Sequence, residues 1–257
     1  LLGFRPIVNK VAPIEFDVAR ASTATRVNRD GLIESVANNI ARVDFADNVN
    51  GALLLEPQGT NLVTYSEDFS NSAWDKVLGG VAYAPVLTAN QGIAPDGTLT
   101  ADRIIFDLNG GTTISDFSRL RFVNLTATNP LISIYIKSNT ENTNQLSLSY
   151  GGDSVFLVNA IPNEWTRVDK LTNASGSFDF RLELRGTQTS DNFADILIWG
   201  AQAEESSVET SYIPTSGTTV TRLADVVGGA GDVNTFNSLE GTLFCNIAAL
   251  ADDLSNR

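Results

Sequence analysis

The stretch from Ala194 to Arg222, ADILIWGAQAEESSVETSYIPTSGTTVTR, constrains the fold of this chain most strongly. Its first six residues alternate between two sides at the period of a β-strand, and both sides are largely apolar. A strand that is apolar on both sides lies inside packed layers rather than at an exposed edge. Gly200 then ends the pattern, and Pro214 keeps the residues before it extended. We therefore expect a central strand that closes a domain, followed by a fixed extended tail.

Five more strand signals, separated by turn residues, occupy the region before this stretch. They are Leu131–Lys137, Gln145–Tyr150, Ser154–Asn159, Glu164–Lys170 and Phe178–Leu184. In the last one, Phe and Leu alternate with charged residues, which is typical of a half-buried strand. Short strands at intervals of roughly 8–12 residues are typical of β-sandwiches and jelly rolls. We therefore predict an all-β fold, an antiparallel β-sandwich of the jelly-roll kind with almost no helix over residues 59–203.

The segment between residues 51 and 130 gives weaker signals. A turn at Ala94–Thr98 has Pro and Gly where a tight reversal needs them, and a strand is expected at Ala101–Phe106. The run from Ser66 to Trp74 is interpreted as a polar loop held by its aromatic residues. Residues 112–130 show no clear period, so we expect them to be irregular.

The chain before the sandwich predicts an extended arm and a β-hairpin. Thr23–Val27 and Leu32–Val36 flank Asp30-Gly31, a turn in which glycine accepts the positive φ. Ala41–Phe45 would complete a three-stranded meander, which is too small to be stable alone. We therefore predict three parts: an arm at residues 1–50 that contacts other chains, a jelly roll at 51–225, and a linker with the first strand of a further domain at 226–257.

Composition excludes several functions. The chain has 17 Lys and Arg against 30 Asp and Glu, a net charge of −13, and no basic cluster, which disfavours nucleic-acid binding. The sequence contains no run of about 18 apolar residues, so it predicts no transmembrane helix. Histidine is absent and Cys245 is the single cysteine, so Ser-His-Asp and Cys-His catalysis and an intrachain disulfide are excluded. We expect no enzyme. Because the chain begins with Leu1, we also expect a piece of a longer or processed protein.

Several segments resemble, in order, a module of tailed-bacteriophage tail-fibre and head-fibre proteins. They are GTNLVTYSEDFSNSAW at 59–74, the strand at 132–137, WTRV at 165–168 and WGAQAEE with TSYIPTSGTTVTRLADV at 199–226. TRVNRDGLIESVANNIARVDF, at 25–45, resembles the segment that precedes this module. The resemblance implies a virion fibre or spike protein on the particle surface, a homotrimer that contacts other virion proteins and attaches to host-surface glycans. Two alternatives stay open: a purely structural capsid-decoration or trimerisation module, and a fragment of a polysaccharide depolymerase.

A glycan site needs flat aromatic rings beside amides and acids. The loops offer Tyr65, Trp74, Tyr83 and Tyr212 as candidate glycan-binding residues. For Trp74, a hydrophobic plug beneath its loop is the alternative to an exposed stacking surface. Trp165 is likewise either a core residue or a platform.

The layout also resembles carbohydrate-binding jelly rolls, in which acids near the two ends of the module hold a structural Ca²⁺. This resemblance implies Glu67, Asp68 and Asp195 as candidate calcium ligands, because calcium prefers hard oxygen donors. Ordinary solvated loop acids are the alternative. No other cofactor is expected.

Overall fold

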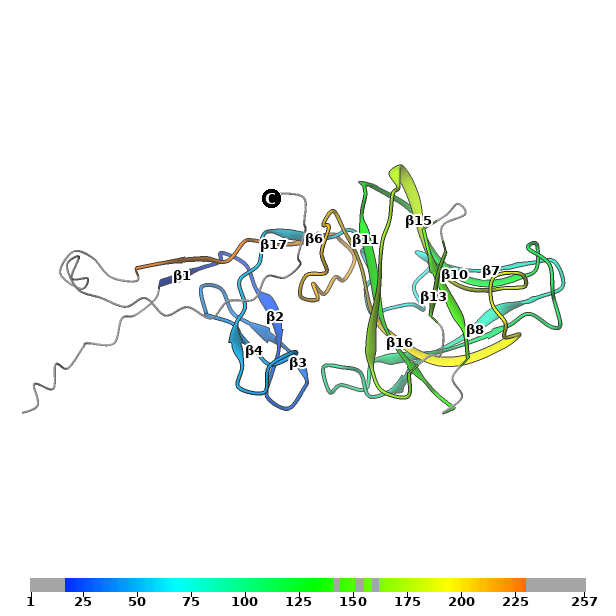
Figure 1. Cartoon of the computed structure of the whole chain (residues 1–257), viewed down its shortest axis with the longest axis horizontal. Helices are drawn as coiled ribbons and strands as arrows, with labels where there is room; N and C mark the ends of the chain where they lie inside the picture. Colours follow the sequence, from blue (N-terminus) through cyan, green and yellow to red (C-terminus); the bar gives the residue numbers. More distant parts are fainter. Residues whose placement is uncertain (1–16, 141–143, 151–154, 159–161, 230–257) are drawn as a thin grey trace, which may run out of the picture.

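The structure, a computed structural model, describes residues 17–140, 144–150, 155–158 and 162–229, and these residues form strands, turns and loops without any helix. Two five-stranded antiparallel sheets dominate them (Figure 1). The first sheet contains, in spatial order, β13 (Val155–Val158), β12 (Leu146–Ser149), β15 (Ser175–Arg185), β10 (Phe117–Thr128) and β7 (Trp74–Gly79). The second contains β14 (Thr166–Leu171), β11 (Leu131–Ser138), β16 (Phe193–Glu204), β9 (Ala101–Asp107) and β8 (Tyr83–Gly92).

The two sheets pack face to face, which confirms the predicted β-sandwich. Alternate residues of β11 and β16 point inward and meet alternate residues of β10 and β15, as the period of two requires. The core residues from these four strands include Ile132, Ile134, Ile136, Ile196, Ile198, Leu120, Phe122, Phe180 and Leu182. The chain crosses repeatedly from one sheet to the other between β7 and β16, as expected for a jelly roll.

The expectation that residues 112–130 are irregular is wrong, because they contain β10, one of the two longest strands. A β-bulge interrupts this strand: its register with β15 shifts between Phe122 and Leu125, and Asn124 has a φ of 62°. The residues before and after the bulge both point inward, but the extra residue breaks the alternation between them. A search for an unbroken period of two therefore misses the strand.

A smaller part precedes the sandwich in the chain and lies beside it, on the side of β11 and β16 in Figure 1. The predicted hairpin is present as β2 (Ala24–Val27) and β3 (Ile33–Val36), with Gly31 at a φ of 80°. The predicted meander is not formed, because β4 (Val43–Asp44) pairs with β5 (Ala52–Leu53) rather than with the hairpin.

Two short ladders join the beginning and the end of the described chain. β1 (Asp17–Ala19) pairs with β18 (Val226–Gly228), and β6 (Gly59–Asn61) pairs with β17 (Val220–Arg222). Residues 226–228, which were expected to begin a linker, are thus a paired strand, while Cys245 and the strand expected around it lie outside the described residues. No helix that could cross a membrane occurs in the part of the chain that the structure describes.

Candidate functional site

A groove of about 420 Å³ lies between the β2–β3 hairpin and the outer face of the second sheet. Its floor is formed by Tyr135 and Lys137 of β11 and by Glu164 and Trp165, which lead into β14. Its walls come from the hairpin and from the loop that follows β8, with Val27, Gly31, Leu32, Ile33, Ile93, Ala94 and Pro95. The groove thus combines aromatic, aliphatic and charged side chains from segments far apart in the sequence.

The strand period of β11 sets the groove floor. Ile132, Ile134 and Ile136 enter the core, so Tyr135 and Lys137 point to the outer face. Tyr135 packs against Trp199 of the neighbouring strand β16, with ring centroids 5.6 Å apart. Burial raises the pKa of Tyr135 above its usual range, so its hydroxyl stays neutral.

The indole of Trp165 is held in place at one side of the groove. Its Nε1–H donates a 2.9 Å hydrogen bond to the carbonyl oxygen of Ile93, in the loop after β8. The residue is only partly buried, so part of the ring faces the groove. The sequence left open whether Trp165 was core or platform; it contacts the cluster around Trp199 and also lines the groove.

The hairpin wall is anchored on the sheet by apolar and polar contacts. Ile33 of β3 packs in a cluster with Ala94, Ala101, Trp199 and Tyr212, and its N–H donates to the carbonyl oxygen of Pro95 at 2.9 Å. From β2, Thr25 Oγ1 donates a 2.6 Å hydrogen bond to the carbonyl oxygen of Tyr212. These contacts fix the hairpin above the outer face of the sheet.

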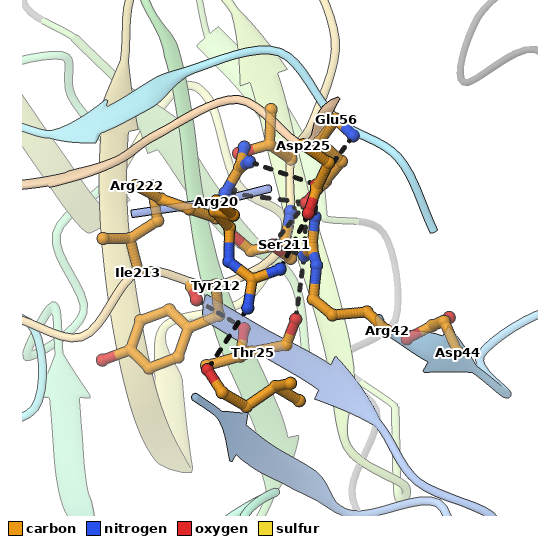
Figure 2. Close-up of polar contacts among 12 residues, drawn as sticks. Arg20, Thr25, Arg42, Asp44, Glu56, Ser211, Tyr212, Ile213, Arg222 and Asp225 are labelled. Atoms are coloured by element: carbon orange, nitrogen blue, oxygen red, sulfur yellow. Dashed lines mark hydrogen bonds and ion pairs between the residues drawn. The ribbon is translucent and has the colours of Figure 1, made fainter. Parts of the chain in front are cut away.

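A buried ionic cluster, formed by Arg20, Arg42, Glu56, Arg222 and Asp225, locks the same region (Figure 2). Arg20 contacts Asp225 at 2.8 Å, and Arg42 contacts Glu56 at 2.7 Å and also pairs with Asp225. Arg42 further donates to the carbonyl oxygen of Thr25 at 2.9 Å and to Ser211 Oγ at 2.8 Å. The cluster therefore ties the arm, the hairpin and the tail after β16 together.

The charges in and beside this cluster balance. The three arginines face Glu56 and Asp225, and the third acid is the buried Glu204 at the end of β16. Glu204 and Arg222 both approach Gly59, where an added Cβ would lie 3.1 Å from Glu204 Oε2 and 3.3 Å from Arg222 Nη2. Burial acting alone would raise the pKa of Asp225. Hydrogen bonds from Arg42 and Arg20 outweigh it and hold this pKa below its usual value.

The predicted glycan residues Tyr65 and Trp74 lie together, but Trp74 is inside the protein. Its side chain is 1% exposed and packs against Phe69, Phe122 and Phe180, with ring centroids 4.9–5.6 Å apart. Its Nε1–H donates to the carbonyl oxygen of Tyr65 at 2.8 Å. The structure thus corrects the reading of Trp74 as an exposed stacking surface in favour of the hydrophobic plug. Tyr65 is half-buried against the same core.

The other two candidates, Tyr83 and Tyr212, have opposite environments. Tyr212 is 3% exposed, and its hydroxyl bonds to Ser66 Oγ at 2.7 Å and Glu67 Oε1 at 2.9 Å, so its ring offers no free face to a ligand. Tyr83 is 56% exposed on β8, which is an edge strand of the second sheet. Tyr83 does not line the groove, and its role in glycan binding stays a prediction.

The three candidate calcium ligands are not brought together. Asp195 forms an ion pair with Arg103 at 2.5 Å, and this hydrogen-bonded pairing lowers its pKa. Glu67 binds the Tyr212 hydroxyl, and Asp68 accepts hydrogen bonds from Ser70 and Asn71 of its own loop. Within the described residues, no group of three or more acidic, His or Cys side chains could hold a metal ion.

The groove residues Lys137, Glu164, Leu32 and Ile93 were missed by the sequence reading. The usable signal was the outward set of β11, where Tyr135 and Lys137 alternate with three inward isoleucines. An aromatic ring beside a cation on the outer face of a strand inside a sheet indicates either a covering segment or a binding surface. The facing hairpin could not be placed from its sequence.

No family model matches this sequence, and no curated protein matches it. Among solved structures, the fold is similar to a family 11 carbohydrate-binding module of Clostridium thermocellum, at 9% identity and a TM-score of 0.38, covering 62% of this chain and 97% of that one. A structure from a study of promiscuous β-sandwich carbohydrate-binding modules matches at 8% identity and a TM-score of 0.38, covering 74% and 85%.

A phage protein is also among the similar structures. The enzymatically active domain of tailspike protein 4 from bacteriophage CBA120 matches at 12% identity and a TM-score of 0.35, covering 56% of this chain and 21% of that chain. At this level the likeness concerns the layout of strands, and it assigns neither a ligand nor an activity to the chain described here.

Proposed function

We propose that this chain is part of a virion fibre or spike protein of a tailed phage, exposed on the particle surface, and that it attaches to host-surface glycans through the groove. The phage part of the proposal is supported by the sequence segments that resemble fibre proteins. The glycan part is supported by one structural observation above all: the partly exposed Trp165 indole lies beside Lys137 and Glu164 in a preformed groove.

The groove has the chemistry that a sugar requires. A pyranose ring presents C–H groups on its faces and hydroxyls at its edge, so a flat aromatic ring and nearby polar groups bind it together. Trp165 supplies the ring, while Lys137 and Glu164 supply a donor and an acceptor. Leu32 and Ile93, which are 38% and 58% exposed, add an apolar rim on either side.

Binding of this kind needs no catalysis, and we propose a binding module rather than an enzyme. The fixed position of Trp165 favours affinity, because its hydrogen bond to Ile93 orders the ring before any ligand arrives. The hairpin wall is held in the same way by the ionic cluster and by the Thr25–Tyr212 hydrogen bond. A preformed site loses less conformational entropy on binding than a mobile loop would.

The test is a glycan array followed by calorimetry with the wild-type chain and two variants. Trp165→Ala should weaken glycan binding roughly tenfold, because an aromatic contact contributes about 1–1.5 kcal/mol beyond area burial. Tyr83→Ala removes a more exposed aromatic residue outside the groove, and it should leave the affinity unchanged. Melting temperatures of both variants separate loss of binding from loss of folding.

Two results would count against the groove. Loss of affinity in Tyr83→Ala with full affinity in Trp165→Ala would move the site to the β8 edge. Absence of binding to every bacterial surface glycan on the array would favour a purely structural module instead.

One observation favours that structural alternative in its own right. The hairpin β4–β5 exposes apolar side chains, with Val43 and Leu53 opposite each other in register and Ile40, Val49 and Leu55 nearby in sequence. Apolar side chains that lie together on a surface are typical of contacts with other proteins. The proposed homotrimer, or attachment to other virion proteins, would cover them. Sedimentation of the wild-type chain and of a Val43→Ser/Leu53→Ser variant tests this, and assembly that the substitutions leave unchanged would rule out these side chains as the contact.

A further inference from the structure

We propose that the groove selects acidic glycans, with a carboxylate of the saccharide bound by Lys137. This inference rests on the proposed glycan-binding function and names the class of its ligand. It starts from the pairing of cations on the outer face of the second sheet, where Lys137 differs from its neighbours.

The neighbouring cations on this face are already neutralised. Arg103, two strands away on β9, pairs with Asp195 at 2.5 Å. Arg167, on β14, pairs with Glu209 at 2.9 Å and donates to the carbonyl oxygen of Thr210 at 2.6 Å. No hydrogen bond or ion pair joins the Lys137 ammonium to another described residue. Among the described residues, the Lys137 ammonium therefore has no acidic partner, and it lies in the groove.

The position of Lys137 suits a ligand that also stacks on Trp165. Ile136 is opposite Thr166 in the β11–β14 register, so the next residues, Lys137 and Trp165, are cross-strand neighbours on the same face. A sugar ring lying on the indole would place an equatorial carboxyl group within reach of the flexible lysine side chain. A contact between the ammonium and a carboxylate joins two opposite charges, so it is stronger than the hydrogen bond that the ammonium would donate to an uncharged hydroxymethyl group.

The net charge of the whole chain excludes general electrostatic attraction as the cause of binding to acidic glycans. At a net charge of −13, the protein repels anions at long range, so general electrostatic attraction does not explain a preference for acidic glycans. Glu164, at the same groove, adds a local repulsion. Two substitutions of opposite sign follow: Lys137→Gln removes the attracting charge, and Glu164→Gln removes the repelling one.

The experiment uses uronic-acid-containing bacterial capsular polysaccharides, each as oligosaccharides in native form and after chemical reduction of the carboxyl groups to alcohols. Binding to the full chain is measured by calorimetry at two salt concentrations. We expect the wild type to bind a native form about tenfold more tightly than its reduced form. The difference should persist at the higher salt concentration, because salt screens the long-range repulsion from the chain more than the close ammonium–carboxylate contact. Lys137→Gln should abolish the difference between the native and reduced forms. Glu164→Gln should increase it.

The possible results distinguish the preference for acidic glycans from glycan binding as such. Equal binding of native and reduced forms, lost in Trp165→Ala, would overturn the acidic preference and leave glycan binding in place. A preference that survives in Lys137→Gln would also overturn it, because the carboxylate would then be bound elsewhere. Binding of neither form, together with no binding to any glycan on the array, would overturn both proposals.

Discussion

Replacing Arg42 by methionine is expected to destabilise the protein by about 3–5 kcal/mol, the usual cost of breaking a buried ion pair from one side. Arg42 is fully buried and serves four acceptors: the carbonyl oxygen of Thr25, Glu56, Ser211 Oγ and Asp225. Methionine fills a similar volume but leaves Glu56 and Asp225 with two cations instead of three. Since a domain is typically stable by only about 5–15 kcal/mol, this is a large part of the total.

The assay is equilibrium unfolding in urea, with limited proteolysis of the β2–β3 turn as a local readout. The matched control is Arg26→Met, because Arg26 pairs with Glu34 on the exposed side of the same hairpin and such pairs contribute about 0–1 kcal/mol. A double variant, Arg42→Met with Glu56→Gln, should lose less than the sum of the two single changes. A free energy of unfolding of Arg42→Met within about 1 kcal/mol of wild type, with a turn equally resistant to protease, would contradict this role of Arg42.

Three further outcomes follow from the structure. Trp74→Ala should cost about 3–5 kcal/mol in urea unfolding, because it empties an aromatic core site between Phe122 and Phe180; a cost under 1 kcal/mol would contradict the plug. Burial raises the pKa of Asp102 to about 6, so the folded chain keeps a proton that the unfolded chain has lost above about pH 3.8, and stability should fall as pH rises through this window. Asp102→Asn should therefore stabilise the protein by about 1–2 kcal/mol at pH 7, once the cost of one unpaired amide is subtracted. It should not stabilise the protein at pH 4, and an equal effect at both pH values would contradict the raised pKa. Gly31→Ala should cost about 1–2 kcal/mol through backbone strain alone, because Gly31 has a φ of 80° and an added Cβ meets nothing within 4 Å; an unchanged melting temperature would disprove it.

Much of the sandwich could be predicted from the sequence, because unbroken alternation is a local signal. β11 and β15 were each predicted to within a few residues, and the inward side chains of both strands are part of the core. The expectation that Gly200 ends the next strand is wrong, because β16 continues through Gly200, at a φ of 63° and beside a shift in its register with β11, to Glu204. β10 was missed because of the bulge after Phe122, which is also a local feature but one that disrupts the period used to find strands.

The candidate site was less predictable, since its parts meet only in the folded chain. Arg20 and Asp225 are 205 residues apart in sequence, so no spacing rule could pair them. Trp74 and Tyr212 lie in or beside polar segments, yet both rings are buried. Trp74 begins β7 and packs in the core between the sheets, while Tyr212 packs against Trp199. The sequence identified useful aromatic residues but not which of them keep a free face.

The most direct test of the account is a crystal structure of the chain with a bound oligosaccharide taken from the glycan array. We predict sugar density in the groove between the β2–β3 hairpin and the second sheet, with a ring on Trp165 and polar contacts to Lys137 or Glu164. An empty groove, with sugar density on the outer face of the first sheet or along the β8 edge at Tyr83, would contradict glycan binding in the groove.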